Sequence, residues 1–355
     1  MIRYFSIAII FIQAISFDSG ALQTEKDQIS EPAQCWIPGL MEQISAVDEN
    51  MPGRLGVYIK NLDDGKSLSY NGENDWYFAS TTKIPLAIAI LQRVENNELT
   101  LDSELTLQQS DFLDGNGDIK WQSPGTKYTI ATLIEKSLQE SDNISTDMLI
   151  RLIGEEELNK QVRQNMVSEG FNPITTILQV RFDAFSEIHK NAMDLTNMDI
   201  LHINSTPCRN ERLDRLISLL AINETELYAI SIEEAFERYY QTGLNSGKLE
   251  SMVLLLERLH RGELLSEEHT NYLLHVMENI ITGDRRVKAG LPQGIRYAQK
   301  TGTQIETASN VGIIYPGNNG RQPIIVAVKA RNFNQTIHAE RAMETIGRLI
   351  SETFL

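Results

Sequence analysis

Residues 324–328 read Ile-Ile-Val-Ala-Val, an uninterrupted apolar run. Such a run is typical of a strand that is buried on both faces of a sheet. Four further segments have strand character and lie toward the two ends of the chain, at 55–62, 67–71, 295–299 and 311–315. We therefore expect strands from both ends to form one antiparallel sheet, in which the 324–329 strand pairs with an N-terminal strand.

The residues between these strands show helical periodicity. The stretch 81–187 is mostly helical, 190–248 is acidic and helical, and 249–280 is helical again. A last helix carries four apolar residues on one face, Met343, Ile346, Leu349 and Ile350. This order of elements predicts an α+β fold with two lobes. One lobe is an antiparallel sheet flanked by helices, the other is all-helical, and a cleft lies between them.

The composition excludes several classes of protein. The 355 residues include 32 Lys and Arg against 48 Asp and Glu, which gives a formal net charge of −16. This balance disfavours a nucleic-acid-binding protein, because such a protein needs a basic surface. A hydrophobic fraction of 41% and a charged fraction of 23% are ordinary for a soluble globular protein. Two cysteines exclude a disulfide scaffold and a four-cysteine metal site.

The first residues are typical of a secretory signal peptide. Arg3 supplies a positive start, residues 5–17 are mostly apolar, and Ser19-Gly20-Ala21 offers a small-x-small cleavage site. The apolar run is shorter than the roughly 20 residues of a membrane-spanning helix. We therefore predict that residues 1–21 are removed and that the protein is exported, to the periplasm or the medium.

The mature chain is predicted to begin with a flexible segment, residues 22–34, and to continue as one domain over 35–355. Export would place Cys35 and Cys208 in an oxidising compartment. The sequence leaves open whether these two cysteines pair or remain free thiols.

Ser80 and Lys83 form the first motif that carries chemistry, Ser-x-x-Lys, at the start of a helical pattern. Residues three apart share a helix face, so the lysine amine would lie beside the serine hydroxyl. A neighbouring base activates a serine as a nucleophile, and a helix N-terminus favours a developing oxyanion. The alternative is a capping serine with a solvated lysine.

Two further motifs follow in the chain. Ser141-Asp142-Asn143 could place a hydroxyl and an amide in one cleft, although these residue types also favour an ordinary helix cap. Lys300-Thr301-Gly302 with Thr303 could hold a carboxylate and supply an oxyanion donor, with Gly302 allowing a ligand close to the strand. The alternative for this motif is the end of a hairpin.

The order and spacing of the three motifs are more specific than any motif alone. Ser141 lies 61 residues after Ser80, and Lys300 lies 159 residues after Ser141. This set occurs in class A β-lactamases and penicillin-binding proteins. The six histidines form no HExxH pair, and neither a GxSxG motif nor a P-loop is present. The sequence therefore predicts a serine enzyme without a metal or another cofactor.

Around these motifs the chain resembles the class A serine β-lactamase family, whose members are related to penicillin-binding proteins. The resemblance covers roughly residues 36–187 and 249–331. It includes RLGVYIK at 54–60, FASTTKIPLAIA at 78–89 and SLQESDNISTDMLI at 137–150. The resemblance implies a β-lactam-hydrolysing enzyme of antibiotic resistance or β-lactam catabolism. Its partner would be a small β-lactam, with no nucleic acid and no stable membrane span, and we expect a monomer.

The resemblance also implies roles for single residues. Ser80 would be the acylated nucleophile and Lys83 its proton partner, while Ser141 would pass a proton to the leaving nitrogen. Asn143 would orient the substrate side chain. The substrate's carboxylate and carbonyl would be held by residues of the third motif and by an arginine before it: Lys300, Thr301, Gly302, Thr303 and Arg286.

The water-activating loop departs from the family pattern. The family uses a glutamate there, with an asparagine four residues later, to hydrolyse the acyl-enzyme. Glu187 with Asn191 has the right residues at this separation, and we prefer it as the deacylation base. Asp183 is the alternative, although Arg181 could pair with it merely to hold the loop.

Residues 190–248 are surplus to the family pattern and could be a lid, a partner surface or a neutral insertion. If no carboxylate activates the deacylating water, two other functions are the alternatives. One is a DD-peptidase-like acyltransferase acting on peptidoglycan, and the other is a non-catalytic envelope protein on the same scaffold.

Overall fold

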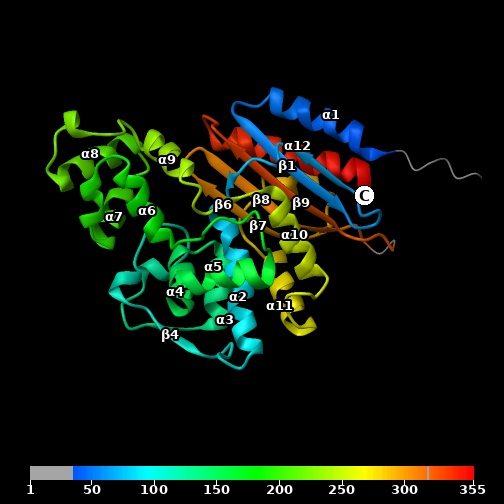
Figure 1. Ribbon diagram of the computed structural model, residues 1–355, viewed down its shortest axis with the longest axis horizontal. Coiled ribbons are helices and arrows are strands. Elements are labelled where there is room, and N and C mark those ends of the chain that lie inside the picture. The colour runs from blue at the N-terminus through cyan, green and yellow to red at the C-terminus, as the bar shows by residue number, and fades with distance from the viewer. Residues whose placement is uncertain (1–34, 318–319) are drawn as a thin grey trace, which may run out of the picture. The chain divides into compact units, whose positions relative to one another are not determined.

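The central strand of the main sheet is the apolar segment near the C-terminus. The computed structural model describes residues 35–317 and 320–355, and in it β9 (Ile324–Arg331) has seven buried residues out of eight. β9 pairs antiparallel with β1 (Arg54–Asn61) on one side and with β8 (Thr307–Tyr315) on the other. The expected sheet of strands from both chain ends, and with it the α+β class, is confirmed (Figure 1).

The complete sheet has the order β2-β1-β9-β8-β7, with β2 (Ser67–Tyr70) and β7 (Arg296–Gln304) at its edges. β7 continues five residues beyond the predicted strand because it pairs with β8 as far as Gln304 opposite Thr307. The third sequence motif therefore lies within an edge strand instead of following it.

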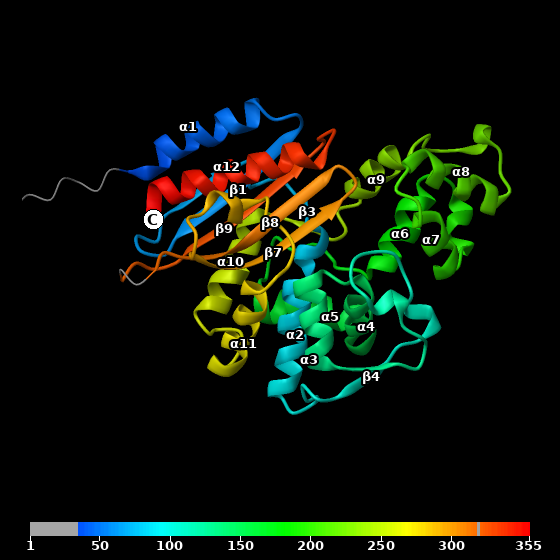
Figure 2. The ribbon, with the colours of Figure 1, turned by 180° about the vertical axis from the view of Figure 1, so that it is seen from behind.

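Two helices, α1 (Trp36–Glu49) and α12 (Thr336–Phe354), cover one face of this sheet (Figure 2). The four apolar residues predicted for the last helix are all buried against it. The sequence analysis did not identify α1, which buries only Leu40 and Ile44 fully. Such a narrow apolar stripe is a weak periodic signal.

The helical lobe surrounds α2 (Lys83–Glu95), whose first nine residues are all buried. Pro85 is its third residue, where the missing N–H would have no partner within the helix. The other helices of this region are α3 (Ile130–Glu135), α4 (Asn143–Ile153), α5 (Glu155–Gln161), α10 (Leu249–His260) and α11 (Glu267–Glu278). Two small antiparallel sheets of two strands each pair β3 (Trp76–Tyr77) with β6 (Ser246–Gly247) and β4 (Glu104–Thr106) with β5 (Lys127–Thr129).

The surplus segment builds a third apolar core, which the two-lobed expectation did not include. It consists of α7 (Asn197–Asn204), α8 (Arg209–Leu220) and α9 (Ile232–Gln241), packed on α6 (Ile177–Ser186). In Figure 1 these helices stand together at one side of the sheet. Their shared core includes Phe185, Leu216, Phe236 and Tyr239. We call these four helices the α6–α9 unit.

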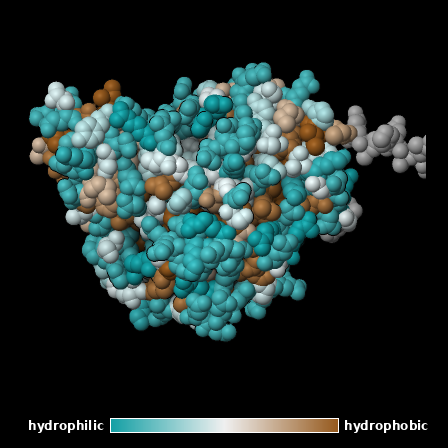
Figure 3. All heavy atoms as spheres, in the orientation of Figure 1, coloured by the Kyte–Doolittle hydropathy of each residue, from teal (hydrophilic) through white to brown (hydrophobic). Residues whose placement is uncertain are grey.

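The surface seen in Figure 3 is largely hydrophilic, with apolar side chains scattered over it. Within the described residues, no helix combines the length and the apolar character that a membrane crossing requires. Cys35 and Cys208 are both exposed and free. The predicted signal peptide at 1–21 and the segment 22–34 lie outside the described residues.

Candidate active site

Ser80 lies in a short 3-10 turn, Ala79–Thr82, that leads directly into α2. Ala79 has a φ of 48°, a left-handed conformation that is uncommon for a residue with a side chain. The turn is held by the Thr81 hydroxyl, which donates to the Phe78 carbonyl at 2.7 Å. Ser80 itself is half-buried and lines a cleft of about 380 Å³.

Lys329, which the sequence analysis did not identify, stabilises this turn through two hydrogen bonds. Its Nζ atom donates to the Phe78 carbonyl at 3.1 Å and to the Thr81 hydroxyl at 3.0 Å, and the residue is fully buried on β9. Burial lowers the pKa of this lysine well below its usual range. A lysine within an apolar strand gave no local signal, because its partners are about 250 residues away in the chain.

Gly302 allows β7 to lie against the Ser80 turn. A Cβ atom at this position would come within 2.9 Å of the Ala79 Cβ and 2.5 Å of the Ser309 Oγ. The glycine is therefore required for packing between protein segments. The sequence analysis had assigned it to the approach of a ligand, and it also lines the cleft.

Lys83 is buried behind Ser80 and points to the second motif. Its Nζ donates to the carbonyls of Ser141 and Asp142 at 2.8 and 3.2 Å and to the Asn143 Oδ1 at 3.0 Å. Burial lowers the pKa of Lys83 to about 7. At neutral pH this amine therefore exists in both protonation states and can take up or release a proton.

Ser141 joins the first motif to the third. Its Oγ accepts from Lys83 Nζ at 3.3 Å and from Lys300 Nζ at 3.0 Å. A hydroxyl has two acceptor lone pairs and one proton, so the proton of Ser141 is free to point into the cleft. Ser141 follows a π-helical turn, Lys136–Glu140, and has a φ of 57°. Both features are common at functional sites.

Asn143 is fixed from two sides. Its Oδ1 accepts from Lys83, and its Nδ2 donates to the Asp114 carbonyl at 2.9 Å. Gly115 packs directly on this amide, because a Cβ there would lie 2.3 Å from the Asn143 Nδ2. The amide is thus oriented before any substrate binds, and it lines the cleft.

Arg286 is buried beneath β7. One Nη atom donates to the carbonyls of Gly302 and Ser309 at 2.9 and 2.8 Å, and the other donates to the Thr303 hydroxyl at 2.6 Å. It lines the cleft together with Thr301 and Thr303. Lys300 is fully buried, and burial followed by the nearby charges of Lys83 and Arg286 lowers its pKa well below the usual range.

The cleft thus brings together the residues predicted for acylation and substrate binding. Ser80, Ser141, Asn143, Arg286, Thr301 and Thr303 line it, and the two lysines reach Ser141 from below its surface. The Lys83 backbone N–H donates to the Ser80 carbonyl, but among the described residues no hydrogen bond joins the two side chains.

The predicted deacylation base does not reach this cleft. α6 presents Ile177, Val180 and Arg181 to it, and the described residues that line it include no carboxylate. Asp183 lies on another side of α6 and accepts from Gln179 Nε2 at 2.7 Å. Glu187 follows the last residue of α6 and does not line the cleft. The residue spacing fits, but neither carboxylate is among the residues that line the cleft.

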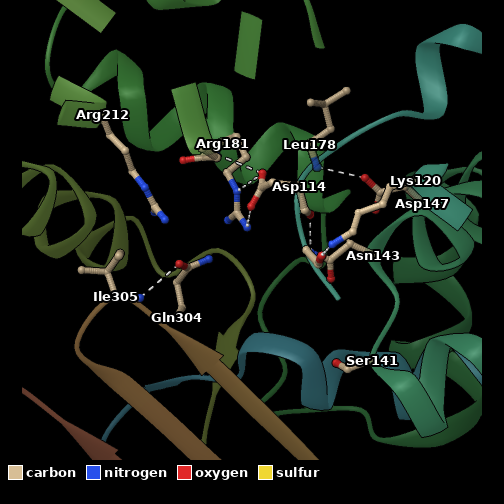
Figure 4. A network of polar contacts seen from close by, with 12 residues as sticks. Asp114, Lys120, Ser141, Asn143, Asp147, Leu178, Arg181, Arg212, Gln304 and Ile305 are labelled. Atoms are coloured by element: carbon tan, nitrogen blue, oxygen red, sulfur yellow. Dashed lines mark hydrogen bonds and ion pairs between the residues drawn. The ribbon is translucent and has the colours of Figure 1, made fainter. Parts of the chain in front are cut away.

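Two aspartates, the buried Asp147 and the half-buried Asp114, fix α6 at this wall instead (Figure 4). Asp147 accepts from the backbone N–H groups of Ile177 and Leu178 at 2.8 and 2.9 Å, and burial raises its pKa to about 7. Asp114 binds Arg181 through two parallel bonds of 3.0 and 2.9 Å. Arg181 therefore pairs with Asp114, whereas the sequence analysis had suggested Asp183 as its partner.

Comparison with known proteins agrees with this geometry. The family model described as "Beta-lactamase enzyme family" matches residues 39–354. A "Beta-lactamase" of Proteus vulgaris is 24% identical over 293 residues, covering 81% of this chain and 85% of its own. "Beta-lactamase VEB-1" of Pseudomonas aeruginosa is 24% identical over 291 residues, with 80% and 79% covered.

Solved structures share the fold. The structure titled "Ancestral (GNCA) Beta-lactamase class A" has a TM-score of 0.66 at 23% identity and covers 89% of this chain and 100% of its own. "Structure of PBP-A" has a TM-score of 0.64 at 22% identity, with 89% and 96% covered. Because the family model matches almost the whole described chain, this protein belongs to the Beta-lactamase enzyme family.

Proposed function

We propose that the protein opens the β-lactam ring by forming a covalent ester on Ser80 and then hydrolyses this ester. The observation that carries the proposal is the position of the Ser141 hydroxyl. Both Lys83 and Lys300 donate to its oxygen, at the cleft that Ser80 lines. Ser141 thereby connects the base of the nucleophile with the group that would hold the substrate.

In the acylation step, the Ser80 Oγ attacks the ring carbonyl carbon and its proton passes to the neutral amine of Lys83. The ring C–N bond then breaks. Ser141 donates its proton to the leaving nitrogen and regains one from Lys83, so the net transfer is from Ser80 to nitrogen. The backbone N–H groups of Ser80 and Thr303 would stabilise the oxyanion.

The third motif would bind the carboxylate of the β-lactam nucleus. Lys83 and Arg286 lie close enough to the buried Lys300 that the positive charge of each disfavours the protonated form of Lys300. An anion in the cleft would relieve this repulsion. The hydroxyls of Thr301 and Thr303 supply further donors at the same edge.

For hydrolysis of the ester, we propose that Lys83 takes the proton of the attacking water. A pKa of about 7 suits this role, and the described lining of the cleft offers no carboxylate for it. We expect deacylation to be slower than acylation, because a positioned carboxylate contributes roughly 10²–10⁴-fold to such a step. We further propose that the enzyme acts outside the cytoplasm.

The test combines a chromogenic cephalosporin with intact-mass spectrometry on the purified mature chain. We expect an adduct on Ser80 that forms quickly and decays slowly with release of the hydrolysed product, and no adduct with Ser80→Ala. An adduct that never decays would favour the peptidoglycan acyltransferase. A folded protein that forms no adduct and gives no turnover would overturn the proposal.

A further inference from the structure

Arg181 has one donor group that the protein does not use. Its Nε and one Nη bind Asp114, whereas the other Nη is buried without a hydrogen-bond partner. The residue is only 7% exposed and lines the cleft with Ser80. Buried donors are nearly always satisfied, because an unmade hydrogen bond is costly. In Figure 4 the free nitrogen points away from Asp114, toward Gln304.

A second arginine comes from the α6–α9 unit and lies beside the cleft, although it is not one of the residues that line it. Arg212 lies on α8, and its Nε donates to the Thr206 carbonyl at 2.7 Å. In Figure 4 its guanidinium group also points toward Gln304, across from Arg181. The two charges are close enough that Arg181 helps, after burial, to lower the pKa of Arg212.

The charges at this end of the cleft do not cancel. Asp114 neutralises one of the two arginines, and its carboxylate also accepts from the Asn204 amide at 3.0 Å. The described residues that line the cleft include no carboxylate. One positive charge and one free guanidinium donor therefore remain at a site that is separate from Lys300 and Arg286.

We infer that Arg181 and Arg212 bind a second carboxylate, one carried by the acyl side chain of the β-lactam. The inference rests on the proposed function. The ring carboxylate would occupy the Lys300 side of the cleft, and the side-chain carboxylate the α6–α9 side. The surplus segment 190–248 then has a role in substrate binding, because it supplies Arg212 and, through Asn204, helps to orient Asp114.

The experiment compares benzylpenicillin with carbenicillin, which differs from it by one carboxylate on the acyl side chain. Equilibrium dissociation constants are measured by calorimetry in a Ser80→Ala background, so that binding does not depend on acylation. We expect carbenicillin to bind about ten-fold more tightly, as a charge-assisted hydrogen bond allows.

Arg212→Gln should reduce this preference to about three-fold, since a half-exposed charge is partly screened, and leave benzylpenicillin binding unchanged. The double variant Arg181→Gln/Asp114→Asn should also reduce the preference to about three-fold, because Arg212 remains, and it leaves no aspartate unpaired. Arg215→Gln is the matched control. It removes the same charge from α8, but its guanidinium binds the His202 carbonyl and Ser205.

A preference that is absent in the Ser80→Ala protein, or that survives Arg212→Gln as fully as Arg215→Gln, overturns the inference. If the double variant does not fold, as judged by circular dichroism, Arg212→Gln alone decides. If the unmodified protein forms no adduct on Ser80 while the carbenicillin preference holds, the proposed function fails and the second-carboxylate site stands.

Discussion

At the scale of single residues, the candidate active site contains lysines that burial has made less basic. Lys83, Lys300 and Lys329 are all buried, and desolvation is the largest cause of the lowered pKa of each. Desolvation disfavours the charged form of a lysine. Only Lys83 has hydrogen-bond acceptors from both residues that follow Ser141, which keeps its amine in reach of the reacting groups.

The pH dependence of acylation follows from Lys83. Its pKa is lowered from 10.5 to about 7, so the fraction of neutral amine rises as the pH rises through 7. We expect the acylation rate constant to increase about ten-fold from pH 6 to pH 8. Stopped-flow measurements of ester formation on Ser80 test this. A rate that is flat between pH 6 and 9 would exclude Lys83 as the base.

At the scale of elements, α6 decides which side chains face Ser80. Ile177, Val180 and Arg181 share the face that lines the cleft. The N-terminus of α6 is fixed by Asp147, which accepts two backbone N–H groups there. Because the helix continues without a break to Ser186, the orientation of every later side chain follows from this anchor.

Glu187→Gln and Asp183→Asn should therefore leave the lifetime of the β-lactam adduct unchanged within about two-fold. Neither carboxylate lines the cleft, so neither can hold the deacylating water. Intact-mass spectrometry after removal of excess substrate gives the lifetimes. If Glu187→Gln trapped the adduct, the sequence-based assignment would be restored and our proposal for Lys83 in deacylation would fall.

At the scale of the whole described chain, the active site depends on contacts between sheet and helices. β9 contributes Lys329 to the turn that carries Ser80, and β7 packs on the same turn through Gly302. The α6–α9 unit joins the sheet through Tyr240, whose hydroxyl donates to the Ile305 carbonyl at 2.8 Å. The cleft thus lies where the sheet, the helical lobe and the α6–α9 unit meet.

Lys329→Met tests the link between the sheet and the Ser80 turn. We expect the acylation rate constant to fall about ten-fold, because the Phe78 carbonyl and the Thr81 hydroxyl lose a shared donor. Non-covalent binding of benzylpenicillin, measured with Ser80→Ala, should not change. Thr81→Val should have a similar effect, and the two changes should be strongly non-additive if they act through one contact. Additive effects would contradict this account.

Some features of this protein could be predicted from its sequence, and others were decided only by its tertiary structure. The strands, the last helix and the three motifs could be predicted from the sequence. Apolar periodicity is a property of neighbouring residues, and the motifs are recognised from their order and spacing along the chain. Only the tertiary structure decided three features: the partner of Arg181, which is 67 residues away, the support of the Ser80 turn by Lys329, and the absence of Glu187 from the lining of the cleft. These contacts depend on how helices and strands pack, and packing is determined by the whole set of buried surfaces rather than by any local pattern.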